Sequence, residues 1–400
     1  MAGPLEGIKV LELGTLIAGP FAARMFAEFG AEVVKVEDPA SGDPIRNWRY
    51  LHEGTSLWWY VQARNKKSIA LNLKDARAQA IAKALALDAD VVIENYRPGV
   101  LEKWGLGYEQ LRAANAATIM VRISGYGQTG PMRDRPGFGA IGESMGGIRF
   151  VSGHPDRPPV RIGISIGDSI AALHGVIGAL MALRHRDATG GRGRGVGQFV
   201  DVALYEAVFN MMESTVPEFD RYGVVRARTG GALPGIVPSN TYSCANDAAI
   251  VVAGNGDAIF KRLMSAIGRP DLAEDPALAR NEGRVRRTEE IDDAIQAWCS
   301  ERSIDDALSI LQAADVPASR IYSVADMVED AQFAARDMIE QQQLPDGTPL
   351  KVPAVVPKLS ATPGGTAWLG PRLGEHTEEI LMRLGHDQAA IDALRCDGVI

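Results

Sequence analysis

The chain of 400 residues exceeds what a single hydrophobic core usually serves, so we expect two lobes. Its composition, 46% hydrophobic and 23% charged, is that of an ordinary soluble globular protein. The net charge of −8 argues against a nucleic-acid-binding protein, because such proteins need clustered lysine and arginine to neutralise phosphates.

Short apolar runs and helical patterns alternate along the first third of the chain. The expected strands cover residues 7–14, 32–37, 68–73, 90–96 and 118–124. The expected helices between them cover 18–31, 75–87 and 107–114. Strands that alternate with helices predict an α/β fold with a mostly parallel sheet covered on both faces.

The second half of the chain changes in texture. A helix follows Asp168, and a strand over 196–204 runs into an expected helix over 205–216. From about residue 221 a stretch with Gly and Pro leads to Pro238. A smaller α+β unit follows, with strands over 242–244 and 249–254 and helices over 257–267, 289–300 and 304–314. From about residue 345 the tail is irregular, with a last helix over 375–384.

Two features bear on compartment and metals. Cys244, Cys299 and Cys396 lie far apart and show no metal-ligand spacing with histidine, so we predict neither a disulfide framework nor a metal site. The first residues lack a basic segment before an apolar core, and the longest apolar stretch, 170–183, is too short to span a bilayer. We expect a cytoplasmic protein that binds no membrane.

A glycine pattern at residues 125–130, GYGQTG, matches the dinucleotide-binding spacing and follows an expected strand. That site requires a helix to open at the glycines, so that its N-terminus can hold the pyrophosphate. Pro131 and the following RDRPGFG prevent a clean helix. The pattern therefore does not predict a nicotinamide or flavin site.

Asp168 stands directly before a long apolar helical run. Aspartate is a favoured helix N-cap, and most residues in such a place do only that. A carboxylate at a helix N-terminus is also stabilised in its charged form and is available as a nucleophile. Position alone favours the capping interpretation.

Two loops offer ligand-binding groups. Residues 95–107 follow the carboxyl end of a strand, where open α/β sheets bind ligands, and Arg97 and Lys103 could pair with phosphates. Residues 253–257, AGNGD, offer flexible backbone N–H groups. The alternatives are a solvated loop for the first segment and an ordinary strand-to-helix turn for the second.

Together these segments resemble the class III CoA-transferases, the CaiB/BaiF or formyl-CoA transferase family. The resemblance rests on residues 4–38, on RNKKSIALNLK at 64–74, on VIENYRPGVLEKWGLGY at 92–108, on SGYGQTGP at 124–131, on the Gly167–Asp168 region, and on LGPRLGEHTEEIL at 369–381. The resemblance spans essentially the whole chain. It favours the interpretation of Asp168 as a nucleophile over its interpretation as a helix cap.

The resemblance implies a fold, a site and a reaction. It implies a Rossmann-like large lobe from residues 1–220 and 331–400, a small lobe from 221–330, and an interlocked homodimer.

Asp168 aligns with the aspartate that forms an aspartyl-acyl anhydride and then an aspartyl-CoA thioester. The CoA-binding positions fall on Ile17, Ala18, Leu71, Lys74, Asn95, Tyr96, Arg97 and Lys103. The loop that closes over the active site corresponds to Gly254, Asn255 and Gly256. Coenzyme A is expected as a substrate, with no tightly bound cofactor.

Departures from the family pattern bear on the substrate. Some formyl-CoA transferases carry Gln where this chain has Ile17 and Arg where it has Asp38. Many members of the family carry Tyr-Asp where this chain has Phe138–Gly139. Residues 234–242 and 398–400 look most like succinyl-CoA-dependent dicarboxylate transferases. This likeness favours succinyl-CoA as the donor and a dicarboxylate or hydroxydicarboxylate as the acceptor. Arg46, Arg49 or Arg161 could pair with a second carboxylate.

Two rival functions remain open. The first is a 2-methylacyl-CoA racemase, although Phe138 stands where those enzymes carry histidine, which leaves no second acid or base. The second is an acyl-CoA binding protein without turnover, against which Asp168 and the glycine loop argue.

Overall fold

The computed structural model describes residues 3–245 and 248–400. Its internal contacts divide the chain into two compact units. The first unit comprises Met1–Ile148, Ile162–Glu213 and Ala334–Ile400, and the second comprises Arg149–Arg161 and Ser214–Phe333. The assignment of a CoA-binding lobe and a smaller lobe to the predicted boundaries stays a prediction.

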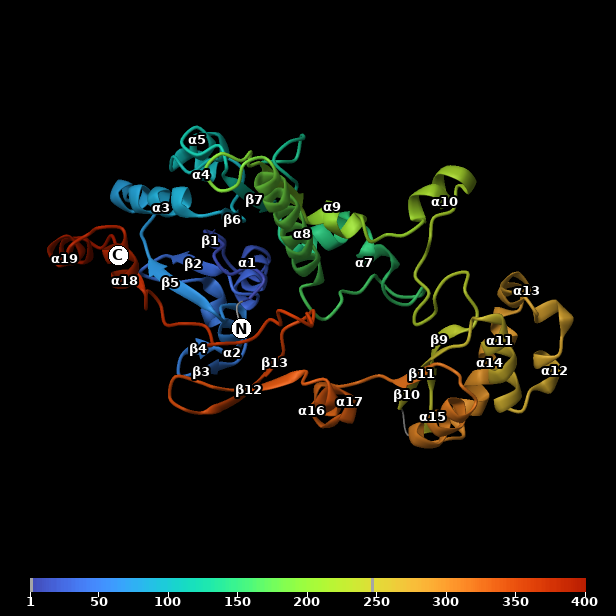
Figure 1. The fold of residues 1–400 in the computed structure, drawn as a ribbon. Coiled ribbons are helices and arrows are strands. Elements are labelled where there is room, and N and C mark those ends of the chain that lie inside the picture. Colours follow the sequence, from blue (N-terminus) through green and yellow to red (C-terminus); the bar gives the residue numbers. More distant parts are fainter. Residues whose placement is uncertain (1–2, 246–247) are drawn as a thin grey trace. The chain divides into compact units, whose positions relative to one another are not determined.

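The first unit is built on a six-stranded sheet in the order β5-β2-β1-β6-β7-β8 (Figure 1). Its strands are β1 Lys9–Glu12, β2 Glu32–Glu37, β5 Lys66–Ala70, β6 Val91–Glu94, β7 Ile119–Ser124 and β8 Phe199–Ala203. Every neighbouring pair is parallel. The predicted α/β class with a mostly parallel sheet is confirmed.

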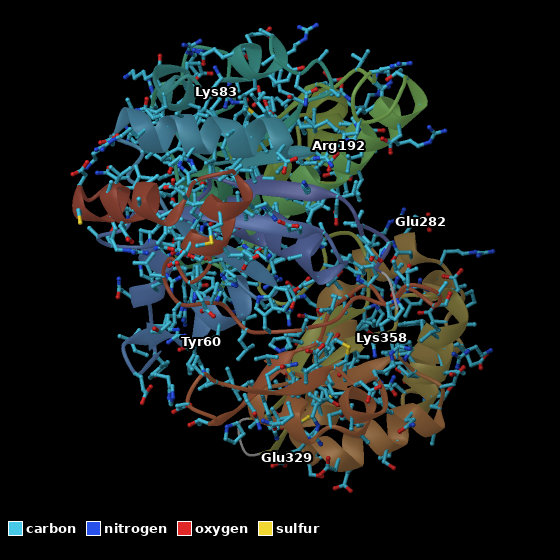
Figure 2. The ribbon with its side chains drawn as sticks, turned by 60° about the vertical axis from the view of Figure 1, so that its left-hand side comes forward. Tyr60, Lys83, Arg192, Glu282, Glu329 and Lys358 are labelled. Atoms are coloured by element: carbon cyan, nitrogen blue, oxygen red, sulfur yellow. The ribbon has the colours of Figure 1, made fainter. Side chains whose placement is uncertain are left out.

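Helices cover both faces of this sheet, so successive strand residues enter different cores. In β1, Val10 packs with α1 (Ala18–Glu28) and α8 (Ile166–Ala188), whereas Leu11 packs on the opposite face with α3 (Ala76–Asp88). Because both neighbours in the strand are buried, the strands read as nearly continuous apolar runs. On the outer side of α3, Lys83 extends away from the sheet (Figure 2).

Shorter elements complete the first unit. They are η1 Pro44–Asn47, β3 Leu51–His52, β4 Thr55–Ser56, α2 Leu57–Gln62, α4 Val100–Lys103, α5 Tyr108–Arg112, α6 Gly139–Met145, α9 Leu204–Phe209, β12 Ile339–Gln343, β13 Pro349–Pro353, α18 Thr377–Arg383 and α19 Gln388–Cys396. The expected irregular tail is wrong in part, because β12 and β13 form an antiparallel hairpin and α19 follows the predicted last helix.

The second unit has its own antiparallel sheet in the order β11-β10-β9 and its own core. Its elements are α10 Thr215–Tyr222, β9 Ser239–Ser243, β10 Ala249–Ala253, α11 Asp257–Ala266, α12 Pro270–Ala273, η3 Pro276–Leu278, α13 Asn281–Arg286, α14 Thr288–Ser300, α15 Ile304–Ala313, β11 Ala318–Arg320, α16 Val324–Glu329 and α17 Ala331–Ala335. The short helix α7, Ile148–Val151, crosses one boundary between the units, and α17 crosses another, because the second unit ends at Phe333. The predicted smaller α+β part is confirmed.

The expected single helix over 205–216 is wrong. Helix α9 ends at Phe209, and α10 begins at Thr215 after a turn that holds Glu213 at a φ of 48°. The reason is Pro217, which cannot donate a helical hydrogen bond and clashes with the carbonyl four residues earlier. The helix restarts so that Pro217 falls in a first turn.

Candidate active site

Asp168 lies in the first turn of α8, as the third residue of the helix, and Ser165 occupies the N-cap position. The simple capping interpretation from the sequence is therefore wrong, because the helix begins two residues before Asp168. A carboxylate in the first turn still lies beside the positive end of the helix dipole. The side chain is half-buried, so it retains contact with solvent.

Gly139, the first residue of α6, lies against the Asp168 carboxyl group. A β-carbon built on Gly139 would lie 2.0 Å from Oδ2 and 2.6 Å from Cγ of Asp168. Phe138, which precedes Gly139, is 67% exposed. The turns at 125–137 separate β7 from α6, so no helix opens at the glycine pattern of residues 125–130.

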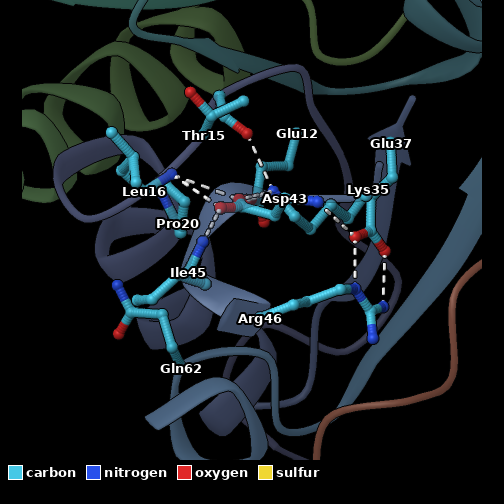
Figure 3. Close-up of polar contacts among 12 residues, drawn as sticks. Glu12, Thr15, Leu16, Pro20, Lys35, Glu37, Asp43, Ile45, Arg46 and Gln62 are labelled. Carbon is cyan, nitrogen blue, oxygen red and sulfur yellow. Dashed lines mark hydrogen bonds and ion pairs between the residues drawn. The ribbon is translucent and has the colours of Figure 1, made fainter. Parts of the chain in front are cut away.

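The loop between β1 and α1 is held by buried side chains from other segments (Figure 3). Leu16 has a φ of 66°, in the left-handed region, and its N–H donates to Asp43 at 3.0 Å. Lys35 donates to the Gly14 carbonyl at 2.8 Å. The Asn95 amide both accepts from the Thr15 N–H and donates to the Thr15 carbonyl, each at 2.8 Å.

Opposite charges are paired beneath this loop. Lys35 contacts Glu12 and Asp43 at 2.8 Å each, and Lys66 contacts Glu12 at 2.7 Å. Burial opposes the charge of Lys35, but attraction to Asp43 and Glu12 outweighs burial and raises its pKa. Burial lowers the pKa of Lys66 to about 8, since Glu12 offsets desolvation only in part and Lys35 repels it. Burial would raise the pKa of Asp43, but Lys35 holds that pKa below its usual value.

A pocket of about 130 Å³ opens beside these groups, at the carboxyl ends of β2, β5 and β6. Three predicted CoA-binding residues line it: Leu71, Lys74 and Tyr96. The Tyr96 ring stands edge-on to Trp104, with 5.3 Å between ring centroids. The sheet topology thus brings together side chains from separate loops at one strand edge.

The other predicted CoA-binding residues lie outside the lining of this pocket. Ile17 and Ala18 are buried at the start of α1, and the Asn95 amide is engaged with Thr15. Arg97 and Lys103 are exposed near α4. Binding of CoA by these residues stays a prediction.

A second buried ion group supports residues 95–103. Arg122 of β7 donates to Glu94 at 2.8 Å and pairs with Glu102 of α4 at 2.8 Å. The other Glu94 oxygen accepts the Tyr96 N–H at 2.7 Å. Burial raises the pKa of Glu94 to about 7, and the pairing with Arg122 offsets burial only in part.

The glycine loop lies in the second unit, between β10 and α11. The N–H of Gly254 donates to the Pro238 carbonyl at 3.0 Å. Arg284, fully buried, donates to the Asn255 carbonyl at 2.7 Å and to Asp257 at 2.9 Å. A guanidinium from α13 therefore fixes the loop conformation, and Asp257 follows the N-cap position, which Gly256 occupies.

The arginines considered for a second carboxylate differ in their surroundings. Arg46 is only 8% exposed; it donates two hydrogen bonds to Glu37 and a third to the Pro371 carbonyl. Its guanidinium lies 3.6 Å from the centroid of a Trp59 ring. Arg46 is therefore a structural ion-pair residue. The guanidinium of Arg49 lies 4.4 Å from the centroid of a Trp58 ring, and Arg161 belongs to the second unit.

Sequence reasoning missed Asp43, Lys35, Glu94 and Arg122. One visible signal was the lysine within EVVKVE, since a charge inside an apolar parallel strand requires a buried partner. Asp43 precedes Pro44 in a loop, and nothing local shows that its carboxylate meets Leu16.

Comparisons with known proteins give consistent similarities. A family model described as CoA-transferase family III matches residues 5–377. The chain is 49% identical to the succinyl-CoA–D-citramalate CoA-transferase of Chloroflexus aurantiacus, over 97% of this chain and 96% of that protein. It is 40% identical to the β subunit of succinyl-CoA–L-malate CoA-transferase from the same bacterium, over 99% and 98%. A crystal structure of a CAIB/BAIF family protein from Brucella suis matches with a TM-score of 0.82 at 33% identity, over 96% and 100%.

Proposed function

Because this chain belongs to CoA-transferase family III, we propose that it moves coenzyme A from succinyl-CoA to a dicarboxylic acid. The family membership confirms the resemblance seen in the sequence and makes the chain a transferase. The observation that carries the choice of substrates is the similarity, at 49% and 40% identity over nearly full length, to two enzymes named for succinyl-CoA and a hydroxydicarboxylate.

Asp168 is the nucleophile of the proposed reaction. Its carboxylate attacks the thioester carbonyl and forms an aspartyl-succinyl anhydride, and the CoA thiolate leaves. The thiolate attacks the aspartyl carbonyl, which releases succinate and leaves an aspartyl-CoA thioester. The acceptor carboxylate displaces CoA to form a second anhydride. CoA then attacks the acceptor carbonyl of that anhydride, and the Asp168 carboxylate is restored.

The proposed CoA site uses the pocket beside Leu71, Lys74 and Tyr96. Its position at the carboxyl ends of parallel strands is where open α/β sheets bind ligands. Arg97 and Lys103 lie on the same βα segment as Tyr96, and their exposed cations would pair with CoA phosphates. Gly254, Asn255 and Gly256 would exclude water, which hydrolyses an anhydride.

The active form is proposed to be a soluble homodimer. In its support, α8 presents an exposed apolar stripe of Leu173, Ile177, Leu180 and Met181. By length and composition α8 could also cross a membrane, but 44% of its most apolar 18-residue window is buried. The buried face packs on the sheet and cannot leave it without exposing the core.

Exchange of labelled succinate into succinyl-CoA tests the chemistry without knowledge of the acceptor. We expect Asp168→Asn to lower this exchange by roughly three orders of magnitude or more, because an amide cannot form the anhydride. The matched control is Asp187→Asn, which removes an exposed carboxylate at the other end of α8. Normal exchange by Asp168→Asn would refute the assignment.

A panel of citramalate, malate, glutarate and oxalate, each incubated with succinyl-CoA, identifies the acceptor by product mass. Transfer to a dicarboxylate supports the proposal. Solvent deuterium that enters a 2-methylacyl-CoA without any acceptor would instead indicate a racemase. CoA binding without exchange of any acid would indicate a binding protein.

A further inference from the structure

Helix α6 presents a face of glycines to its neighbours. Gly139, Gly142 and Gly146 recur at helical spacing along Gly139–Met145 and its C-cap. A β-carbon on Gly142 would lie 2.7 Å from Cβ of Leu204, and one on Gly146 would lie 2.6 Å from Cβ of Val208. These close contacts fix α6 against α9, which carries Leu204 and Val208.

The remaining glycine of this face, Gly139, contacts the side chain of Asp168. All three atoms nearest to a β-carbon on Gly139 belong to the Asp168 carboxyl group: Oδ2 at 2.0 Å, Cγ at 2.6 Å and Oδ1 at 3.1 Å. Real β-carbons essentially never approach another heavy atom within 3.0 Å. In this chain, with its other residues unchanged, a side chain at position 139 therefore requires the Asp168 carboxylate to move by about an ångström.

The backbone does not explain the glycine. Gly139 lies at the start of a helix, outside the left-handed region that favours glycine. Alanine would fit its backbone and would improve the helix propensity of α6. The close contact at this position is with the Asp168 carboxyl group.

The neighbouring contacts limit how Asp168 can respond. A β-carbon on Gly167 would lie 3.0 Å from the Gly139 carbonyl and 3.1 Å from Cγ of Glu143, so the first turns of α6 and α8 are in close contact. Because α8 is packed in the core through Ala171 and Ala172, and aspartate has two side-chain torsions, rotation of the carboxylate is the smallest adjustment.

We infer that Gly139 is a positioning residue for the nucleophile: its bare α-carbon is the surface on which the Asp168 carboxylate rests, and a side chain there turns the carboxylate away from its attack position. This inference rests on the proposed function of Asp168. Misplacement of a reacting group by about 1 Å costs on the order of 100-fold in rate. The effect is expected in kcat, because the residues proposed to bind CoA lie on other elements.

The activity experiment compares Gly139→Ala with Gly142→Ala in the exchange of labelled succinate into succinyl-CoA. Both changes add one methyl group to the same face of α6, but only the first meets Asp168. We expect Gly139→Ala to lower kcat by roughly 10- to 100-fold with little change in KM for succinyl-CoA. Gly142→Ala should lower the melting temperature and should lower kcat much less than Gly139→Ala does, because its added methyl group meets Leu204 and not Asp168. Unchanged kcat in Gly139→Ala would overturn the inference.

A thermal double-mutant cycle tests the contact without any chemistry. Asp168→Ala removes the three atoms nearest to the added methyl group. We expect Gly139→Ala to lower the melting temperature by roughly 2–4 °C in the parent chain and by none in the Asp168→Ala chain. Equal shifts in both backgrounds would overturn the inference even if kcat falls. Exchange that persists in Asp168→Asn would refute the nucleophile instead, while the cycle would still report the contact.

Discussion

At the scale of single residues, the carboxyl group of Glu94 has a pKa far above its ordinary value. Its carboxylate is 1% exposed at the end of β6, and the charged groups that face it are Arg122 on β7 and Glu102 on α4. Burial raises the pKa of Glu94 from 4.5 to about 7. At mildly acidic pH, Glu94 is therefore a neutral, buried acid next to the segment that carries Tyr96 and Arg97.

This shift predicts the pH dependence of stability. Between pH 4.5 and about 7, Glu94 is ionised in the unfolded chain but still protonated in the folded chain. The folded state therefore binds more protons, and the free energy of unfolding falls as pH rises, by about 3 kcal/mol at most. We expect Glu94→Gln to remove this fall, as measured by urea unfolding at several pH values.

The matched control for that experiment is Glu102→Gln. Burial opposes the charge of Glu102, but the hydrogen bond and charge of Arg122, together with backbone N–H groups, outweigh burial and lower its pKa. Glu102 therefore adds stability above pH 4.5 and loses it as pH falls. In Glu102→Gln, the free energy of unfolding should still fall as pH rises toward 7. An identical slope in Glu94→Gln and the parent would contradict the assignment.

Individual residues were predictable from the sequence only where local pattern decides. The predicted strand over 32–37 implies that its valines are buried, and Val33, Val34 and Val36 are at most 5% exposed. The role of Asn95 was not visible in the same way, because its amide partner, Thr15, is 80 positions away in sequence. Long-range polar contacts have no periodicity, so a single sequence shows the residues but not their pairing.

At the scale of elements, the β1–α1 loop depends on Asp43. Its carboxylate accepts the N–H groups of Leu16 and Ile45 and neutralises Lys35 (Figure 3). The left-handed backbone of Leu16 is an unfavourable conformation for a branched side chain, so the loop needs this support. The same loop leads to Ile17 and Ala18 at the start of α1.

We expect Asp43→Asn to destabilise the chain by about 3 kcal/mol or more, because Lys35 stays buried with less negative charge around it. The displaced loop should raise KM for succinyl-CoA by roughly tenfold, with a smaller effect on kcat. Thermal unfolding and exchange kinetics measure the two effects. In Asp38→Asn, which loses only local bonds near Ser41, the melting temperature should change little. Equal melting temperatures for both variants would contradict the role of Asp43.

Elements with a clear period were predicted well, and short or glycine-rich elements were missed. The predicted strand over 32–37 coincides with β2, and α14 departs from its prediction by one residue at the start. Helix α6 was missed because GAIGESM has little apolar periodicity and two glycines that disfavour a helix. Hairpin β12–β13 was missed because IEQQQ lacks the alternation of a strand. Both elements form through packing that local pattern does not report.

At the scale of the whole molecule, the outward stripe of α8 requires a cover. Leu173, Ile177, Leu180 and Met181 are 40%, 50%, 42% and 67% exposed and fall on one helical face. Apolar patches of this kind on soluble proteins mark interfaces. The opposite face of α8 packs Ala171, Val176 and Ala179 into the core, so insertion into a membrane would expose that core.

A second copy of the chain is the cover that we propose, and the parent protein should therefore sediment at twice 42.8 kDa. Ile177→Glu places a charge in the centre of the stripe and should shift the mass toward the monomer or raise the dissociation constant by at least tenfold. Lys83→Glu, on the outer face of α3 (Figure 2), is the matched control and should leave the mass unchanged.

Because one relative is named as a β subunit, a heteromer is the main alternative to a homodimer. A parent chain that stays monomeric at micromolar concentration would contradict the homodimer, because a second copy would then not cover the apolar stripe of α8.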